Sequence, residues 1–409
     1  MSYTQYINTA WPSSLDSLEG VPDIFEPRIR PDERGAASRW AHDALEGFGA
    51  ILPGVALAFA LAWAGYLLSE LIGQRLHFDK GKSPVSPITL AVILGLIIRN
   101  TIGVPKSYEQ GLRLCIKTVL RLGIVILGLT LSLKAIGHSV VAGLPVVVIC
   151  ITTALVVVTY VNRMLGLSRR LGTLIAVGTS ICGVSAIVAT APVIDAEEDE
   201  TSYAVACITV FGLIALIAYP FLAHAIFGGN QQQAGIFLGT AIHDTSQVTG
   251  AGLAYAQQYH ADAAMKMAVT VKLVRNLCMS VLIPLMAILY RRGQQGGAKV
   301  KQPWHQILPL FVVGFVIMAC VRSLGDQTLG PAGANPAFGF IPTATWSHVD
   351  PYAKITVSWL LATALGAVGL GTGFAKLKGL GWKPFSVGFA AALLVGCVST
   401  LLIKLFVRV

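Results

Sequence analysis

Two short polar stretches of this chain carry the residues best able to do chemistry. Residues 178–185 read GTSICGVS and residues 239–246 read GTAIHDTS, so Gly, Thr, Ile and Ser recur at the same four positions. Both stretches lie within segments apolar enough to cross a bilayer, where a lipid-facing backbone must form its hydrogen bonds within its own helix. Matched polar interruptions of such helices are typical of the binding site of a secondary transporter.

The first stretch is suited to binding an anion. Gly183 lets the backbone leave helical geometry, and the free N–H groups at the start of a half-helix attract a small anion. Side chains that can donate or accept hydrogen bonds surround it, and we expect substrate contacts from Thr179, Ser180, Cys182 and Ser185. The alternative is that these small residues only allow helices to pack closely.

The second stretch contains an ionisable pair, His243 and Asp244, followed by Thr245, Ser246 and Gln247. An ionisable residue within an apolar span is costly and indicates a functional site. We expect Asp244 to bind a coupling cation or proton and His243 to take part in coupling, because histidine can titrate near neutral pH. The next three residues are expected to contact substrate. The alternative is a structural histidine and a carboxylate paired with a basic residue.

A third group lies in the apolar segment 263–290. Lys272, Arg275 and Asn276 stand at positions i, i+3 and i+4, so they share one face of a helix. Two cations at this depth must meet carboxylates, carbonyls or an anion. We expect Lys272 and Arg275 to neutralise a substrate anion. The alternative is a structural salt bridge to Asp244, or to Asp195 and its acidic neighbours.

The elements that position these residues must be membrane helices. The chain of 409 residues is 55% hydrophobic and 12% charged, whereas soluble domains carry about 25% charged residues. We predict an all-α polytopic membrane protein with ten or eleven transmembrane helices and internal repeats. A polar N-terminal tail, 1–48, precedes a transmembrane transporter domain, 49–409. The apolar spans are predicted at 49–72, 85–103, 114–133, 139–161, 171–194, 202–227, 234–256, 263–290, 305–324, 348–375 and 383–407.

The net charge of +10 comes mostly from basic residues in short loops between these spans. Loops predicted to be inside carry more Lys and Arg than the others, which predicts a cytoplasmic N-terminus. No basic stripe interleaved with aromatic residues and no nucleic-acid motif occurs, so nucleic acid is not an expected partner. The seven cysteines form no CxxC pair, and we expect neither a metal site nor a cofactor.

At these residues the chain resembles the YeiH-type sulfate exporter family, over essentially everything after residue 48. The stretches that carry the resemblance are 120–129 (LRLGIVILGL), 178–187 (GTSICGVSAI), 191–194 (APVI) and 242–248 (IHDTSQV). The resemblance implies kinship with cation/proton antiporters and bile-acid symporters, which have inverted repeats and two crossed broken helices. It places the crossing at residues 180–183 and 242–246, and it implies a homodimer in a bacterial inner membrane. The shorter carboxylate of Asp244 departs from the Glu that the family also uses, which puts the size of the site in doubt.

Together these features predict a secondary active transporter that exports a small anion, sulfate, sulfite or an organosulfonate, by alternating access coupled to protons or a cation. A monovalent cation/proton antiporter is one alternative, with Asp244 as the exchanging carboxylate, and an anion channel is another. An enzyme is not expected, since Ser180, Cys182, His243 and Asp244 match no catalytic motif such as GxSxG or HExxH.

Overall fold

The computed structural model describes residues 36–75, 83, 85–279, 281–283, 285–286, 310–329, 335–373 and 382–407. Nearly all of them are helical, and the β geometry in these ranges is one isolated bridge between Ala337 and Ile341. The elements are α2 (Ala36–Arg75), α3 (Pro87–Thr101), η4 (Lys106–Tyr108), α4 (Glu109–Leu114), η5 (Cys115–Val119), α5 (Leu120–Leu127), η6 (Gly128–Thr130), α6 (Leu133–Met164), α7 (Arg169–Ser180), α8 (Val184–Thr190), η7 (Ala191–Val193), α9 (Glu198–Phe227), α10 (Gln231–Ala241), α11 (Thr245–Tyr259), α12 (Asp262–Leu277), α15 (Leu310–Thr328), α16 (Thr343–Ser347), α17 (Val349–Gly371) and α18 (Trp382–Phe406).

Each of the eleven predicted apolar spans contains a helix or a succession of helices, so the all-α polytopic membrane fold is confirmed. Within the described ranges, six helices are long and apolar enough to cross a membrane alone. They are 48–75 of α2, α6, α9, α15, residues 343–371 and α18. Other predicted spans, such as 171–194 and 234–256, are divided into shorter helices by breaks. Span 85–103 holds the 15-residue helix α3, and span 263–290 extends beyond the described residues.

Contacts divide the chain into a unit of residues 1–49 and a unit of residues 50–409. The predicted polar tail, 1–48, lies outside the described residues as far as residue 35. From Ala36 the chain is already in α2, which continues to Arg75. All predicted site residues belong to the second unit.

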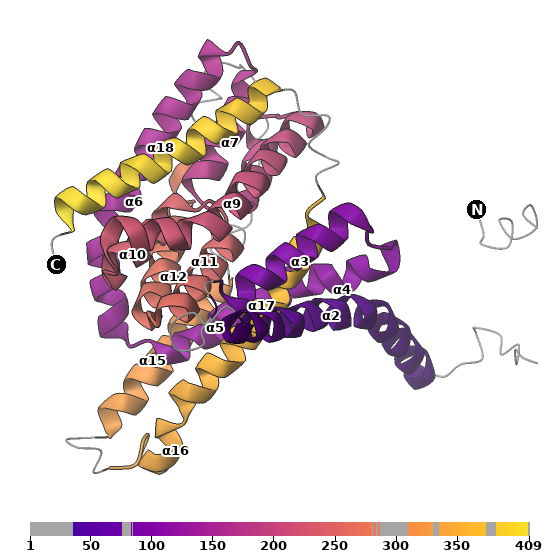
Figure 1. Cartoon of the computed structure of the whole chain (residues 1–409), viewed down its shortest axis with the longest axis vertical. Coiled ribbons are helices and arrows are strands. Elements are labelled where there is room, and N and C mark those ends of the chain that lie inside the picture. The colour runs from indigo at the N-terminus through magenta and orange to yellow at the C-terminus, as the bar shows by residue number, and fades with distance from the viewer. Residues whose placement is uncertain are drawn as a thin grey trace, which may run out of the picture. The chain divides into compact units, whose positions relative to one another are not determined.

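Within the second unit the helices form two groups, which can be followed in Figure 1. In the first group, α10, α11 and α12 pack together, and α6, α7, α9 and α18 pack around them. In the second group, α17 packs against α3, α4 and α5, while α15 packs against α5. Contacts of α11 with α3 and α17 join the two groups. The predicted site residues lie in helices of the first group, in the breaks between them, and on α8, which packs against α7 and α9.

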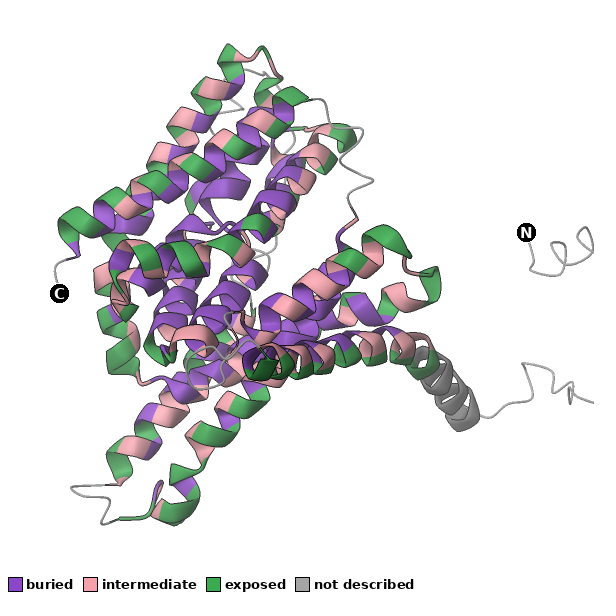
Figure 2. Cartoon of the chain, viewed as in Figure 1, coloured by how far each residue is buried: buried purple, intermediate pink, exposed green. Residues whose placement is uncertain are grey.

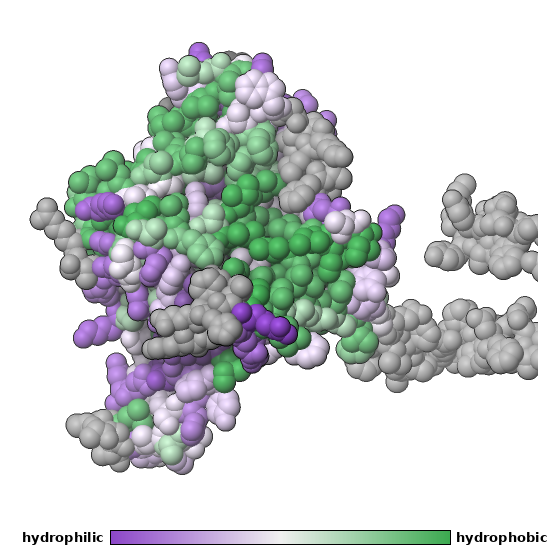
Figure 3. All heavy atoms as spheres, in the orientation of Figure 1, coloured by the Kyte–Doolittle hydropathy of each residue, from purple (hydrophilic) through white to green (hydrophobic). Residues whose placement is uncertain are grey.

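Burial separates central helices from peripheral ones. Figure 2 shows α10, α11 and α12 buried over most of their length, whereas α6 and α18 alternate between buried and exposed residues. The exposed side chains of the peripheral helices include large apolar ones, such as Val141, Val156 and Phe389. Figure 3 shows hydrophobic atoms over α18 and α3 on the face in view. Such an extended apolar surface is typical of contact with a membrane.

Two glycines bring α10 close to α12. A Cβ at Gly235 would lie 2.6 Å from the carbonyl oxygen of Ala264, and one at Gly239 would lie 2.7 Å from that of Ala268. Glycines four residues apart on one helix face allow this approach in membrane proteins. The close packing places the last two turns of α12 beside the carboxyl end of α10.

Candidate functional site

The first helix break separates α7 from α8. The helix α7 ends at Ser180, and Ile181 leaves helical geometry with φ −119° and ψ −101°. Gly183 follows with φ +75° and ψ −124°, a conformation that residues with a Cβ rarely adopt. The predicted interruption at this glycine is therefore present.

The second break separates α10 from α11. The backbone is extended at Ile242 and at Asp244, which is the N-cap of α11. The carboxylate oxygen Oδ1 of Asp244 accepts hydrogen bonds from the backbone N–H of Ser246 at 2.9 Å and from its hydroxyl at 2.5 Å. The side chain of Gln247 accepts in return from the backbone N–H of Asp244 at 3.2 Å. This reciprocal capping box fixes the carboxylate at the start of α11.

The two breaks lie against each other, and residues 179–185 with residues 240–247 are called the crossing below. A Cβ at Gly183 would come within 3.0 Å of the Oδ2 atom of Asp244 and within 3.2 Å of its Cα. Glycine is thus required twice at this position, for its positive φ and for the approach of Asp244. Asp244 is half-buried, so its carboxylate keeps some access to solvent or to a ligand.

Lys272 is completely buried and binds backbone carbonyls at both breaks. Its ammonium donates to the carbonyl of Ile181 at 2.9 Å, to that of Ile242 at 3.1 Å and to that of His243. A charged ammonium has three N–H donors, and here each of them has an acceptor. The side chain therefore joins the loop after α7 to the loop after α10.

Arg275 lies about one turn further along α12, and its guanidinium also donates to backbone carbonyls at both breaks. Nε donates to the carbonyl of Ser180 at 2.6 Å, and Nη2 donates to that of Thr179. Nη1 donates to the carbonyls of Thr240 at 2.6 Å and Ile242 at 3.1 Å. The side chain is 1% exposed.

These two cations provide hydrogen-bond donors for carbonyls that the helix breaks leave unpaired. The last four carbonyls of a helix have no partner within that helix, and the carboxyl end carries about half a negative charge. Lys272 and Arg275 supply donors and positive charge to the carboxyl ends of α7 and α10 together. The bonds described for them go to carbonyls, not to the carboxylate of Asp244 that the alternative hypothesis named.

The remaining predicted residues of the first break differ in accessibility. Thr179, Ser180 and Cys182 are buried, whereas Ser185 is exposed on α8. The hydroxyl of Ser180 donates to the carbonyl of Ala176 within its own helix at 2.5 Å. The thiol of Cys182 lies 3.7 Å from the sulfur of Met279. The first break therefore offers two hydroxyls for a ligand, those of Ser185 and Thr179, the latter buried without a partner in the described part of the chain.

His243 and Asn276 also hold unpaired polar atoms. The ring of His243 is fully buried, and neither of its nitrogens has a hydrogen-bond partner in the described ranges. Asn276 donates to the hydroxyl of Thr245 at 3.1 Å, but its carbonyl oxygen is buried and unpaired there. Buried polar atoms of this kind usually have a partner, which can be water or a ligand.

Two further residues belong to this arrangement. Asn276 shares a face of α12 with the two cations, and this spacing indicates that it lies at the site. Gln247 also donates to the carbonyl of Thr209 at 3.1 Å, in the middle of α9. A Cβ at Gly212 would lie 1.8 Å from the Gln247 side-chain oxygen. No local pattern in the sequence indicates that Gly212 of α9 leaves room for the side chain of Gln247.

Replacing Gly212 with alanine is therefore expected to displace Gln247 and loosen the cap of α11. Overpacking of this kind costs about 1–3 kcal/mol. The matched control is Gly137→Ala in α6, where a Cβ would meet no atom within 4 Å. Both changes bring the same gain in helix propensity. The difference between their unfolding midpoints, measured in detergent, therefore reports the cost of the steric clash with Gln247. Equal midpoints would show that Gln247 does not need the space beside Gly212.

Comparisons with known proteins agree on one family. The model of a family described as conserved hypothetical protein 698 matches residues 53–388. A UPF0324 membrane protein of Corynebacterium glutamicum is 34% identical over 331 residues, which cover 79% of this chain and 85% of that protein. A UPF0324 membrane protein of Agrobacterium fabrum is 30% identical over 358 residues, covering 87% and 93%. No solved structure matches the chain. The names of these relatives describe membrane proteins and state no substrate.

Proposed function

The chain belongs to the conserved hypothetical protein 698 family of membrane proteins, and on that premise we propose that it is a secondary transporter whose substrate site is the crossing. The observation that carries the proposal is the contact between two broken helices at Gly183 and Asp244. Non-helical backbone within an apolar protein is tolerated where it is buried or lines a wet cavity. Transporters use such breaks to present backbone groups to substrate and coupling ions.

The charges at the crossing favour an anion as substrate. Lys272 and Arg275 contribute two positive charges, and Asp244 contributes one negative charge. The carboxyl ends of α7 and α10 each add roughly half a negative charge, which the amino end of α11 partly offsets. The balance is positive and would repel a cation that arrives alone. A small oxyanion such as sulfate, sulfite or an organosulfonate fits this balance, as the resemblance to the YeiH-type family implies.

In this proposal Lys272 and Arg275 act through their positions and charges and not through direct hydrogen bonds to the anion. All three N–H donors of Lys272 and four of the five N–H donors of Arg275 have carbonyl acceptors, so these residues hold the two breaks in place and supply the positive potential. Direct hydrogen bonds to the anion would come from Ser185, Thr179 and the backbone of the crossing, with Ser246 and Thr245 beside them. Asp244 and His243 would carry the coupling proton or cation. We expect the chain to work as an inner-membrane homodimer with a cytoplasmic N-terminus and internal inverted repeats.

Alternating access requires the two helix groups to separate at their junction. At that junction a Cβ on Gly250 of α11 would lie 2.9 Å from methyl groups of Leu216 and Leu365. Both leucines are fully buried, so the contact is a closed apolar seal. Movement of α11 away from α17 would open a path along α11 to Asp244.

The experiment that tests the proposal is counterflow of labelled sulfate in proteoliposomes containing the purified chain. We expect saturable uptake that unlabelled sulfite, thiosulfate or taurine reduces and that a proton or sodium gradient drives. Uptake that never saturates would indicate a channel. Absence of anion uptake together with sodium-dependent proton flux would favour the cation/proton antiporter. This is the second candidate function because the carboxylate of Asp244 lies at the crossing.

A further inference from the structure

The second broken helix turns back on itself. The two glycine contacts of α10 place its start beside the start of α12, so these two helices run parallel. The helix α11 runs antiparallel to them, because Asn276 near the end of α12 donates to the hydroxyl of Thr245 at 3.1 Å. Gly252, further along α11, lies beside Met265 near the start of α12. Residues 231–259 therefore form a hairpin, called the second hairpin, whose tip is at the crossing and whose two ends lie at one face of the membrane.

The first broken helix, residues 169–193, is also a hairpin and is called the first hairpin. A Cβ at Gly178 of α7 would lie 2.8 Å from the Cδ1 atom of Ile187, so α8 lies along α7. The chain returns to the place where α7 began, because the hydroxyl of Ser168 donates to the carboxylate of Glu200 at the start of α9. The 30 residues of α9 extend about 45 Å and lead to the second hairpin. The two hairpins therefore enter from opposite faces, and their tips meet.

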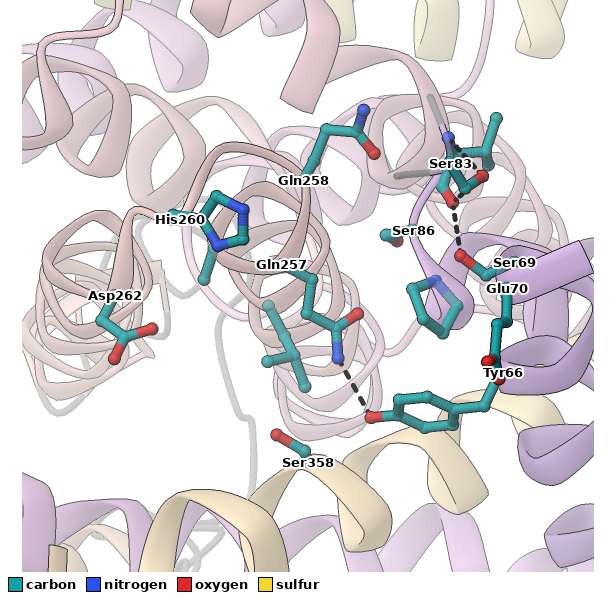
Figure 4. Close-up of a pocket in the computed structure, with 14 residues that line it drawn as sticks. Tyr66, Ser69, Glu70, Ser83, Ser86, Gln257, Gln258, His260, Asp262 and Ser358 are labelled. Carbon is teal, nitrogen blue, oxygen red and sulfur yellow. Dashed lines mark hydrogen bonds between the residues drawn. The ribbon is translucent and has the colours of Figure 1, made fainter. Parts of the chain in front are cut away.

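Three side-chain contacts join the open end of the second hairpin and the start of α12 to the other helix group. Gln257, in the last turn of α11, donates to the hydroxyl of Tyr66 in α2 at 3.0 Å. Asp262, the first residue of α12, pairs with Lys354 of α17 at 2.8 Å. Figure 4 shows Gln257 and Tyr66 pointing toward each other in a cavity of about 690 Å³, whose lining also includes Asp262. These two contacts thus lie in the wall of a cavity between the groups.

The third contact joins a cation of α12 to the end of a helix in the other group. The ammonium of Lys266, which is half-buried, donates to the carbonyl of Thr130 at 2.5 Å. Thr130 ends η6, and carbonyls at a helix end lack partners and carry partial negative charge. About one turn further along α12, Val269 is fully buried in a cluster that includes Phe315 and Leu361. Lys266 therefore binds beside the apolar contact between the two groups.

We propose that these three contacts form a latch that keeps the crossing closed to the face from which the second hairpin enters. Arg169 and Arg170 begin α7 at the opposite face, and an excess of Lys and Arg marks the cytoplasmic side, so the latch lies at the outer face. The proposal rests on the proposed function: release of the latch lets α11 and α12 move away from α17 and opens the apolar seal described above. The latch pairs are Gln257 with Tyr66, Asp262 with Lys354, and Lys266 with Thr130.

The test measures how fast a thiol buried behind the latch reacts. Val269→Cys in the full chain provides the thiol, and a membrane-impermeant maleimide labels it from the outer face of membrane vesicles. The chain without this substitution gives the background from the seven native cysteines. When opening and closing are faster than labelling, the rate follows the population of the open form. Lys266→Met should raise the rate about tenfold, equivalent to about 1.4 kcal/mol in the opening equilibrium. Tyr66→Phe removes one neutral hydrogen bond and should raise it about threefold.

Lys134→Met is the matched control, because Lys134 is exposed near the start of α6 and loses the same charge. It should leave the labelling rate unchanged. The latch is overturned if Lys266→Met and Tyr66→Phe react no faster than this control, or if the added labelling comes from the inner face. A rise from both faces together with a lower unfolding midpoint would indicate unfolding and would also count against it. Absence of sulfate counterflow with the expected labelling would overturn the proposed function and not the latch.

Discussion

Replacing Arg275 with alanine is expected to cause the largest loss of stability of any single substitution at the crossing. The change leaves the carbonyls of Thr179, Ser180 and Thr240 without their donors in a buried environment. Removing one member of a buried charged network typically costs about 3–5 kcal/mol. Arg275→Lys should recover part of the loss, because an ammonium keeps the charge but lacks the planar fork of donors.

The measurement is the unfolding midpoint of the purified protein in detergent, together with the yield of monodisperse protein. Arg113→Ala is the matched control, since Arg113 is 72% exposed and pairs only with Glu109 among the ion pairs described for it. Changes at such surface sites usually stay within about 0.5 kcal/mol. Equal midpoints for the two alanine variants would contradict the role given to Arg275.

Replacing Asp244 with asparagine is expected to remove coupled transport while the protein stays folded. Asparagine caps helices as well as aspartate does, so the bonds to Ser246 can persist. The variant cannot exchange a proton or neutralise a cation at the crossing. We expect gradient-driven sulfate uptake to fall by about tenfold or more, equivalent to about 1.4 kcal/mol, and the remaining uptake to ignore the gradient.

Sulfate counterflow with and without a proton or sodium gradient measures this effect, and the unfolding midpoint confirms that the variant is folded. Asp199→Asn provides the control, because Asp199 is exposed in the first turn of α9 and distant in sequence from the crossing. If Asp244→Asn responded to the gradient as fully as Asp199→Asn, the coupling group would have to be another residue.

The breaks themselves could be predicted from sequence, because glycine and hydroxyl residues within apolar helices have a direct physical meaning. The repeat of GTSICGVS in GTAIHDTS located both of them, and Gly183 and Asp244 indeed lie at their centres. The eleven apolar spans followed from length and hydropathy alone. Their division into long and interrupted helices depends on breaks, which hydropathy averages out.

The hydrogen-bond partners of the two buried cations could not be predicted in the same way. Spacing shows that Lys272 and Arg275 share a face of α12, but it does not show what that face meets. Their acceptors come from the carboxyl ends of α7 and α10 and from the breaks that follow them, 29 to 96 residues earlier in the chain. The approach of α12 depends on the glycines of α10, and the room for Gln247 depends on Gly212 of α9. Such complementarity between distant segments is a property of the packed structure.

The attachment of both helix breaks to one helix has a consequence for the direction of the transport that we propose. Lys272 and Arg275 each bind the carboxyl ends of α7 and α10, so these ends cannot shift relative to each other without breaking buried bonds. The crossing should therefore move as a rigid body and present the same geometry to either side of the membrane. A site of constant geometry binds its ligand with similar affinity from both sides. In the transporter that we propose, net movement would then be reversible and would follow the ion gradients, so export would depend on which gradient the cell maintains.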